Sequence, residues 1–223
     1  MSKRFLIVAA LLILASPTYA AWYDGFAYPD GPLAGNDGWT GSGTGIDVTA
    51  DETVRVGLGG TAFKATVNIT PVAGTVLCTV YAFPGVSGGS NIWGAWYNDS
   101  LGRNYGRWYG SGNTARPRIA GTGLVLSTVT LVPGQWNKLE IVVNESTGFS
   151  SFYHNGAYLG QLQYSGQGSS GGVAQVQIEN FGRSDAPNDY IYLDDMSVVP
   201  EPSSLLALSA LGIGMLGYIK RRR

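Results

Sequence analysis

The chain has 223 residues, which suits a single domain once targeting segments at its two ends are set aside. Charged residues make up only 13% of the sequence, whereas 33 glycines, 13 tyrosines and 6 tryptophans favour short strands and turns over helices. Residues 21–199 hold eight basic and fourteen acidic side chains, and the resulting net charge of about −6 argues against nucleic acid as a partner.

The N-terminal segment, residues 1–20, has the layout of a secretory signal peptide. Lys3 and Arg4 give it a positive start, and the apolar stretch from Phe5 to Ala15 is too short to span a bilayer. Small residues near Ala20 stand at the positions that a signal peptidase reads. We therefore expect cleavage after Ala20 and export by the general secretory route.

The body, residues 21–199, shows no helical periodicity and contains short runs rich in β-branched and aromatic residues. FKATVNI, GTVLCTVYAF, NIWGAWYN and LEIVVN are such runs, and segments rich in Gly, Pro, Asn and Asp separate them. Many short strands at intervals of about 8–12 residues indicate an antiparallel sandwich or barrel. The sequence therefore predicts an all-β fold, and we expect an antiparallel β-sandwich formed by a single domain.

A meander of three strands is predicted in the segment PGQWNKLEIVVNESTGFSSFYHNGAYLGQL. Leu139, Ile141 and Val143 fall on one face of the first strand and are expected in the core. Thr147-Gly148 makes the first turn. Asn155-Gly156 makes the second, a tight hairpin turn, because both residues tolerate positive φ.

The order of tryptophan, strand, turn, strand, Asn-Gly and strand over Pro133–Leu162 resembles laminin-G-like and concanavalin A-like jelly rolls. Laminarinase-type glycosidases on this fold carry Glu-x-Asp-x-Glu, which places two carboxylates across the scissile bond. The chain has no such triplet, and Glu140 stands alone. Cys78 is expected to be a buried hydrophobic residue and His154 an exposed hairpin residue. We therefore expect no catalytic residues and no enzymatic activity.

Aromatic residues concentrate in the stretch NIWGAWYNDSLGRNYGRWYGSG. Alternation puts Trp93 and Tyr97 on one face of a strand and Trp96 on the other, and one face must belong to the core. The other face would be a concave platform on which sugar rings stack, with an arginine bonding hydroxyls or acidic groups. Packing of both faces would explain the aromatic residues equally well. The candidate glycan-binding residues are Trp93, Trp96, Tyr97, Arg107 and Trp108.

Calcium is the one metal to consider, because it prefers several hard oxygen ligands. Jelly rolls bring their first and last strands together, which would place Asp24 near Asp194 or Asp195, with Asp189 in the preceding loop. Alternation would turn Asp194 and Asp195 to opposite faces, so that one of them needs a partner. The alternative is a strand end that carries solvated acids.

The chain ends in VVPEPSSLLALSALGIGMLGYIKRRR. Residues 203–219 carry no charge and would form a helix of about 26 Å, close to the ~30 Å hydrocarbon thickness of a bilayer. The basic residues after it would hold its end in the cytoplasm. A permanent single-span anchor with the body outside is one interpretation of this tail.

The order of Pro-Glu-Pro, apolar helix and arginine cluster resembles the PEP-CTERM sorting signal of Gram-negative bacteria. The residues that carry this resemblance are Pro200, Glu201, Pro202, Arg221, Arg222 and Arg223. The resemblance implies that exosortase, a membrane protease, cuts near the Pro-Glu-Pro and passes the body onward. Proteins of this kind accompany systems that make extracellular polysaccharide.

Residues 1–20, 21–199 and 200–223 are thus expected to be signal peptide, β-sandwich and sorting signal. The leading hypothesis is an exported, non-enzymatic protein of the cell envelope or extracellular matrix, anchored briefly in the inner membrane, with glycan as a candidate ligand. The first alternative is a structural or adhesive surface protein without a ligand. The second is an enzyme that acts on polysaccharide, for which the sequence offers no catalytic constellation.

Overall fold

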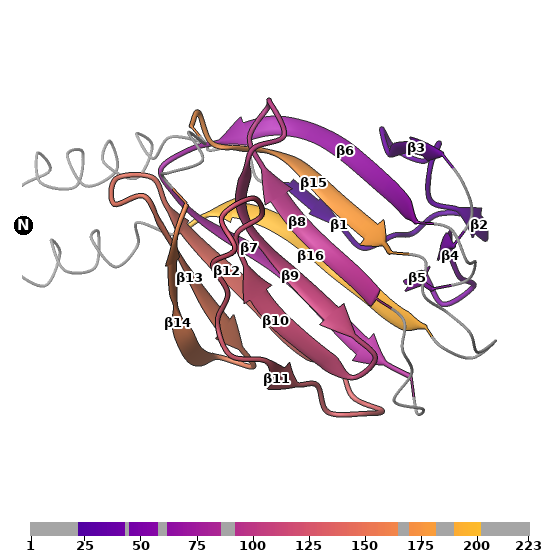
Figure 1. Ribbon diagram of the computed structural model, residues 1–223. Coiled ribbons are helices and arrows are strands. Elements are labelled where there is room, and N and C mark those ends of the chain that lie inside the picture. The colour runs from indigo at the N-terminus through magenta and orange to yellow at the C-terminus, as the bar shows by residue number, and fades with distance from the viewer. Residues whose placement is uncertain are drawn as a thin grey trace, which may run out of the picture.

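A computed structural model describes residues 22–42, 45–57, 62–85, 92–164, 170–181 and 190–201. All strand pairs in these residues are antiparallel, and the strands form two sheets (Figure 1). The predicted all-β antiparallel sandwich is thereby confirmed for this part of the chain. The expected signal peptide and the apolar segment 203–219 lie outside the described residues. Among the residues that are described, no helix is long and apolar enough to cross a membrane.

The larger sheet has nine strands in the order β14-β13-β12-β7-β16-β5-β4-β2, and β1 pairs with β16 beside this path. Their bounds are β1 Trp22–Asp24, β2 Gly31–Pro32, β4 Ile46–Val48, β5 Val54–Val56, β7 Thr75–Pro84, β12 Asn137–Asn144, β13 Phe149–His154, β14 Ala157–Gln163 and β16 Ile191–Pro200.

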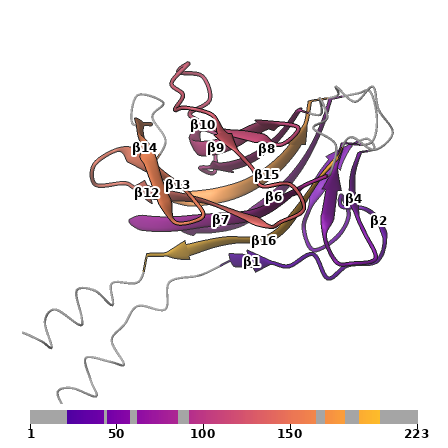
Figure 2. The ribbon, with the colours of Figure 1, turned by 90° about the horizontal axis from the view of Figure 1, so that it is seen from below.

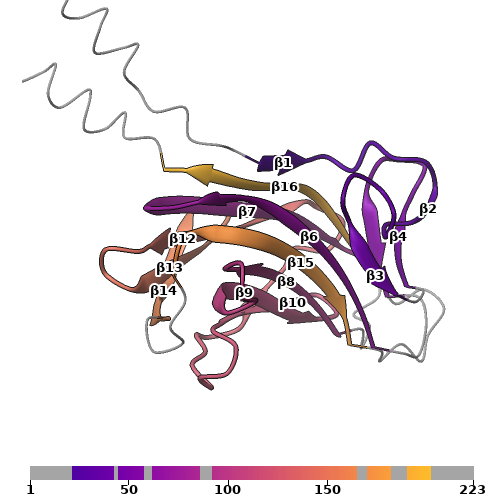
Figure 3. The ribbon, with the colours of Figure 1, turned by 90° about the horizontal axis from the view of Figure 1, so that it is seen from above.

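The smaller sheet has seven strands in the order β11-β10-β9-β8-β15-β6-β3. Their bounds are β3 Thr40–Ser42, β6 Phe63–Val72, β8 Ile92–Asn98, β9 Asn104–Ser111, β10 Thr114–Arg118, β11 Val129–Thr130 and β15 Val173–Asn180. Seen from below and from above, β8, β9 and β10 lie on the side of the molecule opposite β1 and β16 (Figures 2 and 3). The outer face of the seven-stranded sheet therefore points away from β16.

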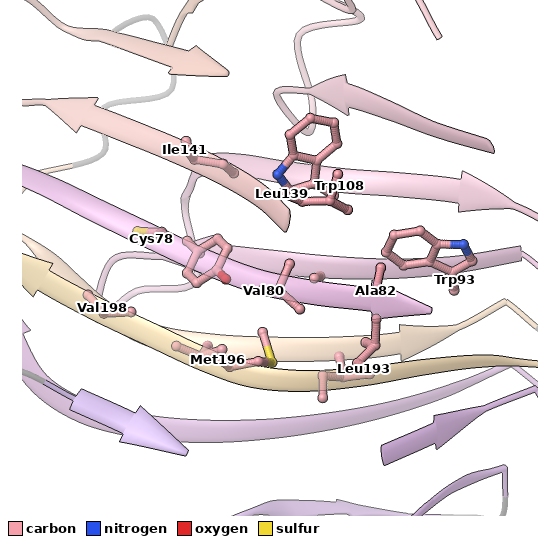
Figure 4. Packing of buried hydrophobic residues seen from close by; sticks show 14 of the residues in the cluster. Cys78, Val80, Ala82, Trp93, Trp108, Leu139, Ile141, Leu193, Met196 and Val198 are labelled. Carbon is pink, nitrogen blue, oxygen red and sulfur yellow. The ribbon is translucent and has the colours of Figure 1, made fainter. Parts of the chain in front are cut away.

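The core fills the space between the two sheets. Leu139, Ile141 and Val143 are fully buried, as their alternation predicts. Trp93 and Trp108 reach into the same core from the seven-stranded sheet, among side chains of β7, β12 and β16 (Figure 4). The alternating faces of both sheets thus provide the apolar surface whose burial drives folding.

Gly110 makes room for Trp93, its partner across β8 and β9. A Cβ atom at Gly110 would lie 2.2 Å from the Trp93 indole and 2.5 Å from the carbonyl oxygen of Thr114. Only glycine allows the indole to lie flat against the neighbouring backbone at this point.

The meander of β12, β13 and β14 forms as predicted. Asn155 and Gly156 connect the last two strands with φ values of 50° and 79°, which fits a tight hairpin turn. The Asn155 side chain also accepts a hydrogen bond from the Lys138 amide at 2.8 Å and so ties the turn to β12.

The first and last strands pair as expected, with Trp22 opposite Val198. β16 lies between β7 and β5, inside the nine-stranded sheet, and its last residue is Pro200. The Glu201 amide then donates a hydrogen bond of 2.8 Å to the Thr75 carbonyl. The start of the Pro-Glu-Pro motif is therefore part of the folded sandwich.

Candidate functional site

Three of the five aromatic-stretch candidates belong to the core. Trp93, Tyr97 and Trp108 are fully buried between the sheets. The Tyr97 hydroxyl donates to the Thr79 carbonyl at 2.8 Å, and Trp108 packs edge-to-face on Phe152 with ring centroids 5.8 Å apart. These three side chains have no surface that a glycan reaches, so their assignment as ligand contacts is corrected here. The alternation of side chains along a strand explains this outcome, because it directs Trp93, Tyr97 and Trp108 inward.

The other two candidates, Trp96 and Arg107, lie on the outer face of the seven-stranded sheet. They stand opposite each other on β8 and β9, and Trp96 is half-buried. The Arg107 guanidinium carbon lies 3.9 Å from the centroid of the Trp96 ring and 5.5 Å from that of Tyr109. This geometry is that of a cation–π contact, which holds the guanidinium in place.

Strand register extends this pair into a straight row across five strands. Gln177 of β15 is opposite Trp96, and Thr66 of β6 is opposite Gln177. On the other side, Arg118 of β10 is opposite Arg107. Residues directly opposite each other share one face of a sheet. We call this set the outer row, which consists of Thr66, Gln177, Trp96, Arg107 and Arg118.

The outer row collects buried polar atoms that have no hydrogen-bond partner. In the described residues seven buried side-chain nitrogen or oxygen atoms lack one. Four of the seven are in the outer row, namely Thr66 Oγ1, Trp96 Nε1, Arg107 Nε and Arg118 Nε. Each such atom costs free energy unless something outside the chain bonds to it. Their concentration in one row makes the outer row the candidate binding surface.

The adjacent row on the same face provides an internal comparison. Asn98 donates to Gln175 at 3.2 Å, and Gln175 donates to Asn68 at 3.1 Å. Each of these three amides lies two residues from the outer-row member of its own strand, β8, β15 or β6. The three amides thus satisfy one another. Missing partners are a property of the outer row and not of the whole face.

The charges of the outer row are close together and partly removed from water. Arg107 is only 6% exposed. Burial, followed by the repulsion of Arg118, lowers the pKa of Arg107 to about 10, so it stays charged at neutral pH. Glu179 on β15 has its pKa raised by burial, against the attraction of Arg107 and Lys64. Among the described residues, no acid forms an ion pair with Arg107 or Arg118.

Asp24, the first calcium candidate, uses its carboxylate for the fold. It accepts hydrogen bonds from the Phe26 amide at 2.8 Å, the Tyr28 hydroxyl at 2.8 Å and the Trp39 indole at 2.7 Å. These donors join the first strand to the loop that follows it and occupy both carboxylate oxygens.

Asp194 and Asp195 do not follow the expected alternation. A bulge in β16 places both between the buried Leu193 and Met196, and Asp195 has a positive φ of 47°. The Tyr23 hydroxyl donates to Asp195. Asp189 lies outside the described residues. Among the residues that are described, no group of three His, Cys, Asp or Glu side chains is arranged to hold a metal ion. A calcium site at these acids stays a prediction.

The two residues with nucleophile or base chemistry have structural surroundings. Cys78 is fully buried, and burial raises the pKa of its thiol well above the usual range. His154 places Nε2 3.2 Å from Asn137 Oδ1, and burial lowers its pKa. Neither arrangement activates a nucleophile.

The sequence did not identify Thr66, Gln177, Arg118 or Glu179 as site residues. Alternation marks each of them as an outward position of its strand, which is a signal available in the sequence. Their alignment with Trp96 depends on β15 lying between β8 and β6, and this order joins segments about 80 to 110 residues apart.

Comparison with solved structures shows jelly-roll β-sandwiches. A sialidase matches with a TM-score of 0.61 and 11% identity over 82% of this chain, which spans only 19% of the sialidase. The Emp47p carbohydrate recognition domain matches with a TM-score of 0.55 and 6% identity over 81% of this chain and 94% of that one. The β-glucanase of Bacillus licheniformis matches with a TM-score of 0.54 and 8% identity over 82% of this chain and 99% of that one.

These identities are low, so the likeness concerns the fold alone. No curated protein matches the chain in sequence. The family model of the PEP-CTERM protein-sorting motif matches residues 198–223. The chain therefore carries a PEP-CTERM sorting motif behind a jelly-roll β-sandwich, and this motif marks it as an exported protein that is processed by exosortase, a membrane protease.

Proposed function

We propose that this exported protein binds polysaccharide of the cell envelope or extracellular matrix through the outer row, without chemically changing it. The sorting motif supports a destination outside the cytoplasm. The outer row supports a ligand that is rich in hydroxyl groups, because sugar hydroxyls both donate and accept hydrogen bonds. At a strand spacing of about 4.8 Å, a row across five strands is roughly 19 Å long, which suits a chain of several sugar rings.

The observation that carries this proposal is the set of four unpartnered buried atoms in the outer row. Leaving a buried donor or acceptor unsatisfied costs about 1–3 kcal/mol. A sheet face that only had to meet water would expose these atoms or bond them to one another, as the neighbouring amides do. A bound polysaccharide would stack one ring beside Trp96 and place its hydroxyl groups along the polar side chains of the row.

Binding is favoured over hydrolysis by the carboxylates of this face. Glycosidases use two carboxyl groups about 5–9.5 Å apart on either side of the bond that is cut. Glu179 is the only carboxylate among the described outward positions of β6, β8, β9, β10 and β15. A single carboxylate cannot fill both roles, so the described face supports recognition of a glycan.

A glycan array followed by titration calorimetry tests the proposal. Trp96→Ala is expected to weaken binding at least about tenfold, because it removes both the ring and the indole donor. Trp96→Phe keeps an aromatic ring against Arg107 and removes the donor, so it should retain part of the affinity and the fold. Trp136→Ala is the matched control, since Trp136 is 42% exposed and packs on Phe83 of the other sheet.

Unchanged affinity in Trp96→Ala would overturn the assignment of the site. Absence of binding to any glycan on the array would overturn the proposed function and favour a structural or adhesive protein. Release of shorter sugars from a bound polysaccharide would instead identify an enzyme.

A further inference from the structure

We propose that the ligand of the outer row is an acidic polysaccharide, one of whose carboxylates binds between Arg107 and Arg118. This inference rests on the proposed function and names the ligand class for the same site.

The first argument is the position of the two arginines. Arg107 and Arg118 are directly opposite each other on β9 and β10, where like charges destabilise a sheet. Arg107 is also more than nine-tenths buried. A buried charge without an ion-pair partner is costly, and a neighbour of the same sign adds to that cost. The attraction of Glu179 offsets only part of it, because the pKa of Arg107 is still lowered. An anion placed between the two guanidinium groups removes both penalties.

The second argument is that three more exposed cations in the described residues have acidic partners. Arg103 lies 2.7 Å from Asp99, Lys138 lies 2.7 Å from Glu140, and Arg55 lies 3.9 Å from Asp47. These three are more exposed than Arg107, so water alone would solvate them more easily. Arg107, which is more deeply buried than these three, has no such partner in the described residues.

The third argument is geometric. A guanidinium binds a carboxylate through two parallel hydrogen bonds from the N–H groups of one edge. Trp96 holds the Arg107 guanidinium at 3.9 Å, so this edge is already oriented before a ligand arrives. A neutral hydroxyl could satisfy one N–H group but would leave the two positive charges facing each other.

The row has a charged end and a neutral end. Arg107 and Arg118 occupy one end, and Gln177 and Thr66 occupy the other, next to Glu179. Within the outer row itself, only Arg107 and Arg118 carry a charge. The fitting ligand therefore places an acidic sugar at the arginines and hydroxyl groups at Gln177 and Thr66.

The test compares sugars that differ only in the carboxyl group. The probes are oligosaccharides of glucuronic, galacturonic, mannuronic and guluronic acid, each beside its carboxyl-reduced neutral counterpart. Calorimetry on the full body should show at least one acidic oligosaccharide binding about tenfold or more tightly than its reduced form, with affinity falling as salt is added. Free sulfate at the same anion concentration should compete poorly, because it does not reach the rest of the row.

Three arginine variants complete the test. Arg118→Gln and Arg107→Lys should each lose most of the preference for the acidic form, since one removes a charge and the other removes the two-pronged edge. Arg116→Gln is the matched control on β10, because Arg116 is exposed and bonds Thr128 at 2.9 Å. Thermal melts verify that the variants are folded. If the Arg107 variant is unstable, the variant of the half-buried Arg118 still measures the preference for the acidic form.

Tighter binding of the reduced sugars would overturn this inference and leave the proposed function standing. Equal loss of the acidic preference in Arg116→Gln, or competition by sulfate as strong as by the oligosaccharide, would also overturn it. If the acidic oligosaccharides, their reduced forms and the glycans of the array all fail to bind, the proposed function itself is refuted.

Discussion

Two carboxylates that support the fold of this protein accept several hydrogen bonds each, in contrast to the polar atoms of the outer row. Asp99 is fully buried and accepts from the Leu101 and Arg103 amides and from Arg103 Nε at 2.7–2.9 Å. Glu145 likewise accepts from the Tyr105 hydroxyl and from the amides of Gly74 and Gly172. Each residue closes a loop, so its polar atoms are satisfied within the chain. At the scale of single residues, these carboxylates are satisfied within the chain, whereas four of the seven unpartnered buried atoms lie in the outer row.

Asp99→Asn is expected to lower stability at neutral pH by about 1–3 kcal/mol, through the lost charge-assisted bonds. Burial alone would raise the pKa of Asp99, but hydrogen bonds from Arg103 and Leu101 lower it below the ordinary 3.8. A depressed pKa means that the carboxylate stabilises the fold above the ordinary value and that this contribution is lost as the pH falls through the depressed value. Urea unfolding at neutral and strongly acidic pH should show the difference between the two proteins shrinking in acid. An equal difference in the free energy of unfolding at both pH values would contradict this role of Asp99.

Glu179→Gln is expected to strengthen binding of an acidic oligosaccharide several-fold at neutral pH, because it removes a like charge beside the outer row. Burial raises the pKa of Glu179, while Arg107 and Lys64 oppose that rise. Glu179 therefore takes up its proton at a higher pH than an ordinary glutamate, and affinity of the unaltered protein should rise as the pH falls toward this raised pKa. Calorimetry from neutral pH downward should show that rise in the unaltered protein and a flatter profile in the variant. Identical profiles would remove Glu179 from the site.

At the scale of elements, alternation determines which side chains each strand buries. It correctly divides Trp93 and Tyr97 from Trp96 and places Leu139 in the core. The Asn155-Gly156 turn is also predictable, because its positive φ values require these residue types. Alternation fails at Asp194 and Asp195, because a bulge breaks the period of two. No turn residue in the sequence marks the position of this bulge.

Gly110→Ala is expected to destabilise the protein by about 1–3 kcal/mol, because the added carbon would overlap the Trp93 indole and the Thr114 carbonyl oxygen, of which Trp93→Leu relieves only the first. Trp93→Leu removes that indole at the cost of a cavity. The double variant should therefore be more stable than the sum of the two single losses implies, which urea unfolding of all four proteins measures. Strict additivity would show that the two residues do not limit each other.

At the scale of the whole molecule, the candidate site and the end of β16, where the sorting motif begins, lie on opposite sides. The outer row faces away from β16, whose end carries the start of the motif (Figures 2 and 3). Sheet order produces this arrangement, with β15 between β8 and β6 and β16 between β7 and β5. Local sequence patterns give the face of each strand but not its neighbours, so the row could not be assembled from the sequence.

A protein that ends at Glu201 should be as stable as the full body, whereas one that ends at Asp195 should fail to fold. The shorter chain lacks Met196 and Val198, which are fully buried in the nine-stranded sheet. Thermal melts followed by circular dichroism compare the two. A cooperative melt of the shorter chain at the same temperature would contradict the structural role of the strand end. By the same reasoning, mass spectrometry of the processed protein should find a C-terminus at or beyond Glu201.

Fluorine NMR of the protein labelled with 5-fluorotryptophan reports on each of its six tryptophans separately and so tests glycan binding at the outer row directly. Trp96→Phe identifies the Trp96 signal, and Trp136→Phe identifies the signal of the exposed tryptophan on the other sheet. On saturation with an acidic oligosaccharide, the Trp96 signal should shift, while the signals of the buried Trp93 and Trp108 and of Trp136 stay in place. A shift of Trp136 with no change at Trp96 would contradict binding at the outer row.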